Sequence, residues 1–252
     1  MFEDPTPPSR VIRTASYLLG FSPTNSQSSV GVVRTTEAEL DGVIAEVRGH
    51  LRAAGYTRNV WNVAPSSRPE NLAEALLARG FFPATEPPYE PEMTAMALVA
   101  PPPSGPPGIE ARPVRDFEEY LASMRIAITM MGSDQEGSGW LAAARTLWDQ
   151  EGGVARYTHV AFLDGEMVGF GWAVPAAAGL FMGGSSVLPA ARGRGAYRAL
   201  IAARWETAVR LGTPALAIQA GAMSRPILEH CGFQAIGRVR ILEDPEVKPE
   251  RR

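Results

Sequence analysis

The chain of 252 residues is poor in the residues that form disulfides, bind metals or create strongly basic surfaces. It has one cysteine, Cys231, and three histidines, and Lys248 is its only lysine. A single cysteine excludes a disulfide within the chain and suits a reducing compartment. The separated histidines and the cysteine have no metal-ligand spacing, so we expect no metal site.

Excess positive charge is also missing. The formal net charge is -3 at pH 7, and arginines scattered along the chain carry nearly all of the positive charge. This balance argues against a nucleic-acid partner. Residues 1–13 contain acids and prolines where a secretory signal needs a basic start and an apolar core, so we expect a cytoplasmic protein.

The longest uncharged run, residues 167–191, raises the question of a membrane span. Glycines and a proline interrupt it throughout, namely Gly169, Gly171, Pro175, Gly179, Gly183 and Gly184. Two buried strands joined by a turn account for such a run better than a transmembrane helix does. We therefore expect no membrane partner.

The composition is that of an ordinary globular protein, since 45% of the residues are hydrophobic and 20% are charged. The length suffices for one or two domains. The segment PPPSGPPG at 101–108 can hold neither a helix nor a central strand. It predicts a boundary. We expect an N-terminal α/β domain at 1–100, a linker at 101–108, a second domain at 109–242 and a polar tail at 243–252.

The first domain shows clear helix and strand signals. Thr36 and Glu39 have the spacing of a capping box, and the helix after them ends at Gly55. Residues 57–63 are predicted to be a strand. Pro69 suits the first turn of a second helix that stops at Gly80.

The second domain alternates strands and helices in a definite order. Asp164-Gly165 is a strong signal for a hairpin. The helix after Gly195 is a crossover between the strands at 180–188 and 215–220, so these two strands are predicted to be parallel. The predicted strands are 109–114, 157–163, 167–174, 180–188, 215–220 and 234–242, and the predicted helices follow Asp116, Ser138, Gly195 and Ser224.

The most informative stretch runs from Val187 through an Arg/Gly turn to Tyr197. Glycines allow backbone N–H groups to converge, and the first turn of a helix adds free N–H donors and a positive dipole end. Three arginines of this stretch, Arg192, Arg194 and Arg198, add mobile positive charge. The stretch predicts a pyrophosphate cradle, with a tight surface turn or an RNA-binding Arg/Gly element as the alternatives.

The order of these elements over residues 109–242 resembles the GNAT superfamily of acyl-CoA-dependent N-acyltransferases. Arg192 and Gly195 match the acyl-CoA signature of the family, whereas Tyr197 stands where a small residue is usual. The stretch Ser224 to Phe233 resembles the family's segment that ends in Gly-Phe. Leu228 replaces the tyrosine with which many members protonate the CoA thiolate.

The resemblance implies an α/β fold whose mixed, mostly antiparallel sheet contains a splayed parallel strand pair and is flanked by helices, beside a smaller N-terminal α/β domain. It implies transfer of an acetyl group from acetyl-CoA to a primary amine of a small molecule. The main chains of Val187 and Leu188 would contact pantetheine and the thioester. The phosphate-binding residues would be Arg192, Gly193, Arg194, Gly195, Ala196, Tyr197 and Arg198.

No residue stands out as the general base. The candidates are Glu136, Asp134, His159 and Glu229, in that order. Solvated loop carboxylates and a packed histidine are the alternative interpretations of these residues.

Other functions remain open beside acetyl transfer to a small amine. A non-catalytic acyl-CoA-binding or regulatory protein would explain Leu228, and a peptide or protein acetyltransferase would need an open acidic groove. In the first domain, Ser67-Arg68-Pro69 and Gly80-Phe81 echo Ser224-Arg225-Pro226 and Gly232-Phe233. This echo suggests a degenerate second GNAT copy, with an unrelated α/β extension as the alternative. An oligomer is compatible with the sequence.

Overall fold

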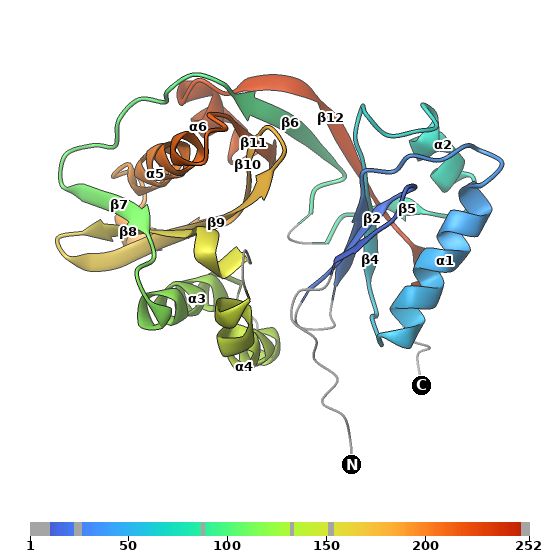
Figure 1. Ribbon diagram of the computed structural model, residues 1–252, viewed down its shortest axis with the longest axis horizontal. Helices are drawn as coiled ribbons and strands as arrows, with labels where there is room; N and C mark the ends of the chain where they lie inside the picture. The colour runs from blue at the N-terminus through green and yellow to red at the C-terminus, as the bar shows by residue number, and fades with distance from the viewer. Residues whose placement is uncertain (1–10, 23–26, 87–88, 132–133, 151–153, 248–252) are drawn as a thin grey trace, which may run out of the picture. The chain divides into compact units, whose positions relative to one another are not determined.

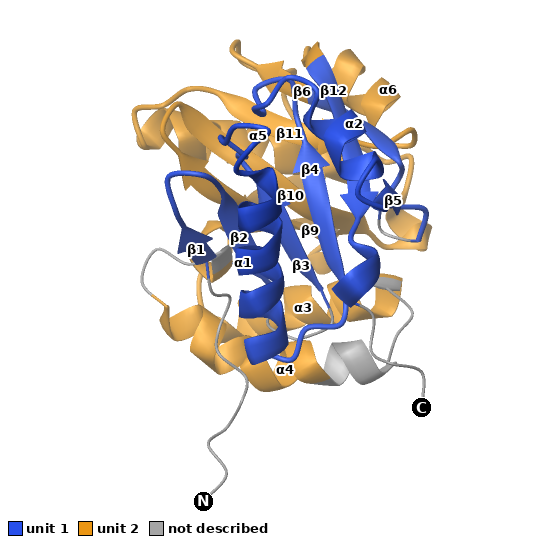
Figure 2. Cartoon of the chain, turned by 90° about the vertical axis from the view of Figure 1, so that its right-hand side faces the viewer, with its two compact units in different colours: residues 1–95, 237–252 blue, residues 96–236 orange. Residues whose placement is uncertain are grey.

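The computed structural model describes all residues except 1–10, 23–26, 87–88, 132–133, 151–153 and 248–252. The chain forms two compact units (Figure 2). Unit 1 contains residues 1–95 and 237–252, and unit 2 contains residues 96–236. The strands β6 (Glu92–Leu98) and β12 (Gln234–Glu243) contribute residues to both units.

Unit 1 is built on a mostly antiparallel sheet. Its strands lie in the order β1-β2-β3-β4-β12-β6, and β5 also pairs with β12. The neighbours β3 and β4 pair in parallel, whereas β1 with β2, β2 with β3, and β12 with β4 and β5 pair antiparallel. The bounds of its own strands are β1 Val11–Arg13, β2 Leu18–Phe21, β3 Ser28–Gly31, β4 Asn59–Val63 and β5 Phe82–Pro83.

Two helices of unit 1, α1 (Leu40–Ala53) and α2 (Leu72–Leu77), pack their apolar sides into one core with β2, β3 and β4 (Figure 1). Trp61 is fully buried there and meets Phe81 edge to face. The spacing of apolar residues along α1 explains this packing, because its buried side chains recur every three or four residues. The predicted helices of this unit are thus present.

Unit 2 has a mixed sheet in the order β6-β11-β10-β9-β8-β7. The strands β7 to β10 pair antiparallel, and β10 pairs with β11 in parallel. This confirms the predicted fold class, including the parallel pair. The bounds are β7 Ile109–Pro113, β8 Thr158–Leu163, β9 Glu166–Ala176, β10 Gly179–Val187 and β11 Leu216–Ala220.

Helices cover both faces of the unit 2 sheet. In Figure 1, α3 (Phe117–Met131) and α4 (Asp134–Asp149) lie on one face and α5 (Ala196–Arg210) lies on the other. Phe170 packs toward Ile126 of α3, whereas Ala161 packs toward Leu200 of α5. The short helix α6 (Arg225–His230) comes after β11, and 3-10 turns occupy Val154–Tyr157, Pro189–Ala191 and Pro245–Val247.

The uncharged run at 167–191 forms β9, a turn and β10. Within the described part of the chain, no helix has both the length and the apolar character that crossing a membrane requires.

The structure differs from the expected domain limits at both ends of the second domain. The expected linker is partly packed in unit 2, because Pro106 lies against Gly195 and Gly105 against Ala199. The first part of the expected polar tail packs in unit 1, since Asp244 is buried and accepts two hydrogen bonds of 2.8 Å from Arg48. Composition alone did not reveal these contacts.

Candidate functional site

The parallel pair β10–β11 opens soon after it begins. Leu180 pairs with Leu216 and Phe181 with Ala217, and β10 then continues to Val187 without a further partner on β11. The sequence predicted this splay closer to Ser186–Leu188, whereas it starts after Phe181. An unpaired strand edge inside a sheet leaves backbone donors available to a ligand.

A β-bulge shapes this open edge. The register between β9 and β10 shifts between Met182 and Ser185, so that β10 has one extra residue there. A Cβ on Gly183 would lie 2.0 Å from the ring of Trp172. The Trp172 ring therefore occupies the space that a side chain at this position would need, which explains glycine at the bulge.

Backbone alternation decides which groups of β10 face the opening. Leu188 donates its N–H to the carbonyl of Val168 at 2.8 Å, so it is bonded toward β9. The Leu188 N–H is therefore already used within the sheet and does not face the opening. Successive residues of a strand direct their N–H groups to opposite sides, so Val187 and Ser185 face the open edge.

The turn after β10 leads into α5 through two left-handed glycines. Gly193 has φ +74° and Gly195 has φ +88°. A Cβ on Gly195 would also lie 2.5 Å from Pro106. Gly195 is the N-cap of α5, and no side chain caps the helix, so its first N–H groups are free to bind an anion.

Three exposed arginines surround this helix start, namely Arg192, Arg194 and Arg198. Arg192 Nε donates to the Val187 carbonyl at 3.3 Å, which folds its side chain back toward the open edge of β10. None of the three forms an ion pair with a carboxylate of the described residues. The charge is therefore available to an anionic ligand.

Beneath β10 lies a buried arginine, Arg204, that was not among the predicted site residues. Arg204 of α5 is fully buried, and its Nη1 donates to Ser185 Oγ at 3.0 Å while its Nε donates to the Leu200 carbonyl. Its Nη2 has no hydrogen-bond partner among the described residues. Burial lowers the pKa of Arg204 to about 10, so it remains a cation at neutral pH.

His159 is a packed core residue. It is fully buried, its Nδ1 donates to the Tyr157 carbonyl at 3.1 Å, and its Nε2 accepts from the Thr207 hydroxyl at 2.8 Å. Burial and, secondarily, the positive charge of Arg204 lower the pKa of His159 to about 3. Both ring nitrogens are occupied, so His159 does not suit the role of general base that its sequence position suggested.

The α6 side of the opening is apolar. Leu228 and Cys231 are buried in one cluster against which the ring of Tyr197 packs. Burial raises the pKa of the Cys231 thiol, which opposes a role as a thiolate nucleophile. Burial also raises the pKa of Tyr197, so its phenol stays protonated at neutral pH.

The remaining candidates for the general base are Glu229, Asp134 and Glu136. Glu229 is exposed and forms an ion pair of 2.8 Å with Arg225. Asp134 and Glu136 belong to the first turns of α4 and not to a loop before it, and their side chains lie outside the described part of the chain.

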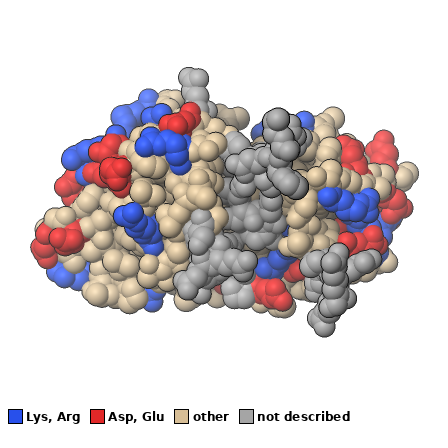
Figure 3. Space-filling model, turned by 90° about the horizontal axis from the view of Figure 1, so that it is seen from below, with Lys and Arg blue, Asp and Glu red and all other residues tan. Residues whose placement is uncertain are grey.

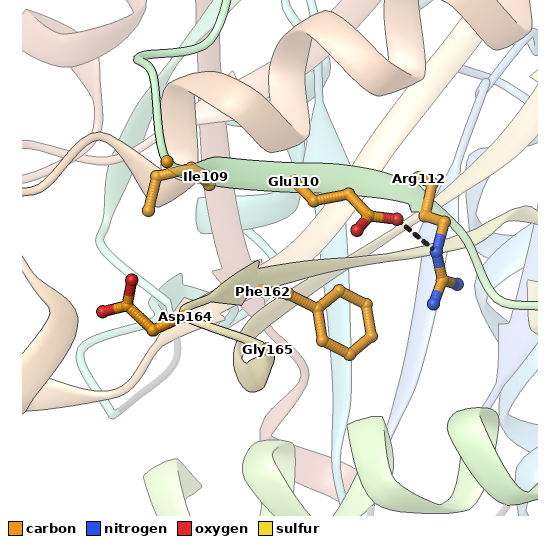
Figure 4. A pocket seen from close by; sticks show the side chains of 7 residues that line it. Ile109, Glu110, Arg112, Phe162, Asp164 and Gly165 are labelled. Atoms are coloured by element: carbon orange, nitrogen blue, oxygen red, sulfur yellow. Dashed lines mark hydrogen bonds and ion pairs between the residues drawn. The ribbon is translucent and has the colours of Figure 1, made fainter.

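A separate hollow of about 560 Å³ lies at the β7–β8 edge of the same sheet (Figure 4). Arg112 lines this hollow. Its Nε donates a hydrogen bond of 2.8 Å to the Glu110 carboxylate, and its guanidinium lies over the Phe162 ring. The strands β8 and β9 separate this hollow from β10 in the sheet order, so it is distinct from the opening beside β11.

Surface charge and metal ligands add little to this site. In Figure 3, side chains of both signs alternate over the visible face without a large region of one sign. Across the described ranges, no cluster of three or more His, Cys, Asp or Glu side chains could hold a metal ion.

Two sequence signals pointed to what was missed. Arg204 lies seven residues after Tyr197, hence on the same face of α5 as the Tyr197 ring that packs against the core. Gly183-Gly184 within a strand is a signal for a bulge. The apolar periodicity was strong enough to locate the helix but gave no reason to place a cation in its core.

Comparison with known proteins agrees with this geometry. Residues 124–233 match the model of the Acetyltransferase (GNAT) family. A GCN5-related N-acetyltransferase from Kribbella flavida has a similar fold, with 16% identity, a TM-score of 0.66, and 94% of this chain and 90% of that chain covered. No curated protein matches the sequence.

Two further solved structures show the same fold. A GCN5-related N-acetyltransferase from Sphaerobacter thermophilus has 17% identity and a TM-score of 0.62, covering 93% of this chain and 81% of that chain. A tandem GNAT protein from the clavulanic acid biosynthesis pathway has 15% identity and a TM-score of 0.60, covering 93% and 79%. At these identities the likeness concerns the fold.

Proposed function

We propose, from the match of residues 124–233 to the acetyltransferase (GNAT) family, that the protein transfers an acetyl group from acetyl-CoA to a primary amine of a small molecule. The observation that carries the proposal is the uncapped, glycine-led start of α5 beside the open edge of β10. A GNAT-type acyltransferase needs such a pair of features, one for the pyrophosphate and one for the thioester end of its donor.

The free N–H groups at the start of α5 and the arginines Arg192, Arg194 and Arg198 would bind the pyrophosphate. Both sources of positive potential are already in place without a competing carboxylate among the described residues. Gly195 lets the backbone turn into the helix, because its φ of +88° disfavours a side chain. Gly193, Ala196 and Tyr197 complete this turn.

The N–H of Val187 would donate to the pantetheine arm or the thioester carbonyl along the open edge. The amine nitrogen attacks the carbonyl carbon, the oxygen gains negative charge, and the carbon–sulfur bond breaks to release CoA as a thiolate. A thiol pKa of about 8.5 makes this a fair leaving group that water can protonate, so Leu228 does not preclude turnover. The amine must lose a proton to a base, for which Asp134 and Glu136 remain our candidates.

One observation favours a second candidate. Leu228 is fully buried in an apolar cluster, so α6 offers no acid at the position where many GNAT members have tyrosine. A non-catalytic acyl-CoA-binding or regulatory protein would tolerate this arrangement. Binding without turnover separates this function from acetyl transfer.

The decisive experiment is a thermal-shift titration with acetyl-CoA and with desulfo-CoA. A ligand that binds only the folded state raises the Tm, because it increases the free energy of unfolding by about 2.7 kcal/mol at a hundredfold excess over Kd. Arg192→Ala and Gly195→Glu should abolish most of the shift. Arg52→Ala, an exposed arginine at the end of α1, is the matched control and should retain it.

Thiol release with a panel of small amines then tests turnover. Release with at least one amine supports the transferase. A thermal shift without thiol release in the presence of any amine or peptide supports the binding function instead. No thermal shift at millimolar ligand contradicts both the transferase and the binding function.

A further inference from the structure

Arg204 is an unusual residue to find at the centre of a sheet–helix contact. Its guanidinium is fully buried between α5 and the sheet, close against Gly171 of β9, where a Cβ would lie 2.9 Å from its Cζ. No carboxylate among the described residues pairs with it, and Nη2 has no partner among them. Burying an unpaired cation is unfavourable, and a leucine or methionine would fill the same space without this penalty.

The contact of Arg204 with β10 defines how the Ser185 hydroxyl is used. Arginine has donors and no acceptor, so Ser185 Oγ accepts the hydrogen bond of 3.0 Å from Nη1. The proton of the hydroxyl must then point to a different acceptor. In the structure this acceptor is the Gly183 carbonyl of the bulge at 3.4 Å, which is a long and weak bond.

Ser185 lies at the part of β10 that has lost its pairing with β11. The residue is half-buried, and its N–H faces the same opening as the N–H of Val187. A ligand at this edge can therefore replace the weak bond to Gly183 with a better one. The cation behind the hydroxyl strengthens it as a donor toward an atom that carries or develops negative charge.

We propose that Arg204 is a positioning residue that holds the Ser185 hydroxyl as a hydrogen-bond donor at the open edge of β10, where the hydroxyl binds the thioester group of acyl-CoA. The proposal rests on the proposed acyl-CoA function and adds a specific side chain to it. It explains why the strand bulges at Gly183, since the extra residue reverses the facing of the next residues and directs Ser185 toward α5.

The neighbouring serine provides a matched control. Ser186 is paired with Phe170 and therefore lies on the α3 face of the sheet, opposite Ser185. We would measure Kd by calorimetry for wild type, Ser185→Ala, Ser186→Ala and Arg204→Met, with acetyl-CoA and with desulfo-CoA. Desulfo-CoA keeps the pyrophosphate and the amides but lacks the sulfur and the acetyl group.

Ser185→Ala should weaken acetyl-CoA by about fivefold, the ordinary net effect of one hydrogen bond, and leave desulfo-CoA unchanged. Ser186→Ala should change neither affinity. Arg204→Met should weaken acetyl-CoA in the same direction, and adding Ser185→Ala to it should cause little further loss, because Arg204 acts through Ser185.

The result that overturns the inference is a Ser185→Ala protein that binds acetyl-CoA as wild type does, or that loses both ligands equally. If Arg204→Met does not fold, the Ser185 and Ser186 variants still decide the matter. If wild type binds neither ligand, the proposed function fails and the inference falls with it, whereas normal wild-type binding with an unaffected Ser185→Ala refutes the inference alone.

Discussion

The two units contain the same run of elements. In unit 1 the order is β3, α1, β4, α2, Gly80-Phe81 and β5. From unit 2 onward it is β10, α5, β11, α6, Gly232-Phe233 and β12, the strand that continues into unit 1. Both runs have a parallel strand pair joined by the longer helix. This correspondence supports our proposal that unit 1 is a degenerate GNAT-like copy, and it makes the local differences informative.

The first difference lies at the start of the longer helix. Before α1, the Glu39 carboxylate accepts a hydrogen bond of 3.1 Å from the Thr36 N–H and another from the Thr36 hydroxyl. These bonds lower the pKa of Glu39, so a negative charge occupies the helix start. The start of α5 has glycine and arginines instead. Only α5 therefore suits an anionic ligand.

The second difference is the edge beside the first parallel strand. In unit 1 the chain beyond β3 stays bonded, because Arg68 donates to the Val33 carbonyl at 2.9 Å and accepts from the Thr35 N–H at 3.3 Å. In unit 2 the pairing ends at Phe181 and Ala217. Backbone hydrogen bonds therefore close this edge in unit 1, whereas the corresponding edge in unit 2 remains open.

The third difference is the buried face of the helix. The buried residues of α1 are all aliphatic, whereas those of α5 include Arg204 and Thr207. A ligand site thus depends on a few local departures from good packing within a shared framework. Unit 2 has the local features that suit ligand binding, an open strand edge and an uncapped helix start.

The largest effect is expected at the bulge. Gly183→Ala forces the Trp172 ring to move and should lower the free energy of unfolding by about 3 kcal/mol, with loss of the acetyl-CoA thermal shift. Gly31→Ala at the end of β3 is the matched change in unit 1 and should be tolerated, since nothing lies within 4 Å of its Cβ. Urea unfolding compares the two, and equal losses would contradict the contrast between the strands.

A smaller, pH-dependent effect is expected from His159. Its pKa is about 3 in the folded protein and 6.5 when unfolded, so the unfolded state binds more protons between these values and stability falls as pH decreases through this window. The loss should reach about 2 kcal/mol near pH 5. His159→Gln should flatten this dependence, and the exposed His230→Gln should not.

Urea midpoints measured between about pH 7 and pH 5 provide the test. Carboxylates such as Glu119, whose pKa is lowered by Arg112, lose their contribution only at lower pH. A His159→Gln protein with the wild-type slope would show that the acid sensitivity arises outside the α5 contact.

The smallest effect is expected at the start of α1. Glu39→Gln removes the charge that stabilises the helix start and should lower the Tm slightly, because the side chain is exposed. The acetyl-CoA shift should stay unchanged, since the edge beside β3 remains bonded through Arg68. If calorimetry showed that this variant binds one more equivalent of acetyl-CoA than wild type does, the charge of Glu39 alone would have kept unit 1 from binding the ligand.

Local signals in the sequence were sufficient for most of the framework. The Asp164-Gly165 hairpin, the helix after Gly195 and the Arg/Gly turn depend on turn chemistry and periodicity, which act over a few residues. The parallel direction of β11 could be deduced from the length of its crossover. For these reasons the fold and the glycine turn before α5 could be predicted.

Tertiary structure decided the features that depend on contacts between distant segments. Leu188 is bonded to Val168, His159 is sealed in the core, and Arg204 meets Ser185 across nineteen positions of the chain. Burial and hydrogen-bond partners set the chemistry of these groups, and neither can be inferred from residue type or spacing. The sequence by itself determined where the strands, helices and glycine turns lie, and packing determined which of their polar groups remain available to a ligand.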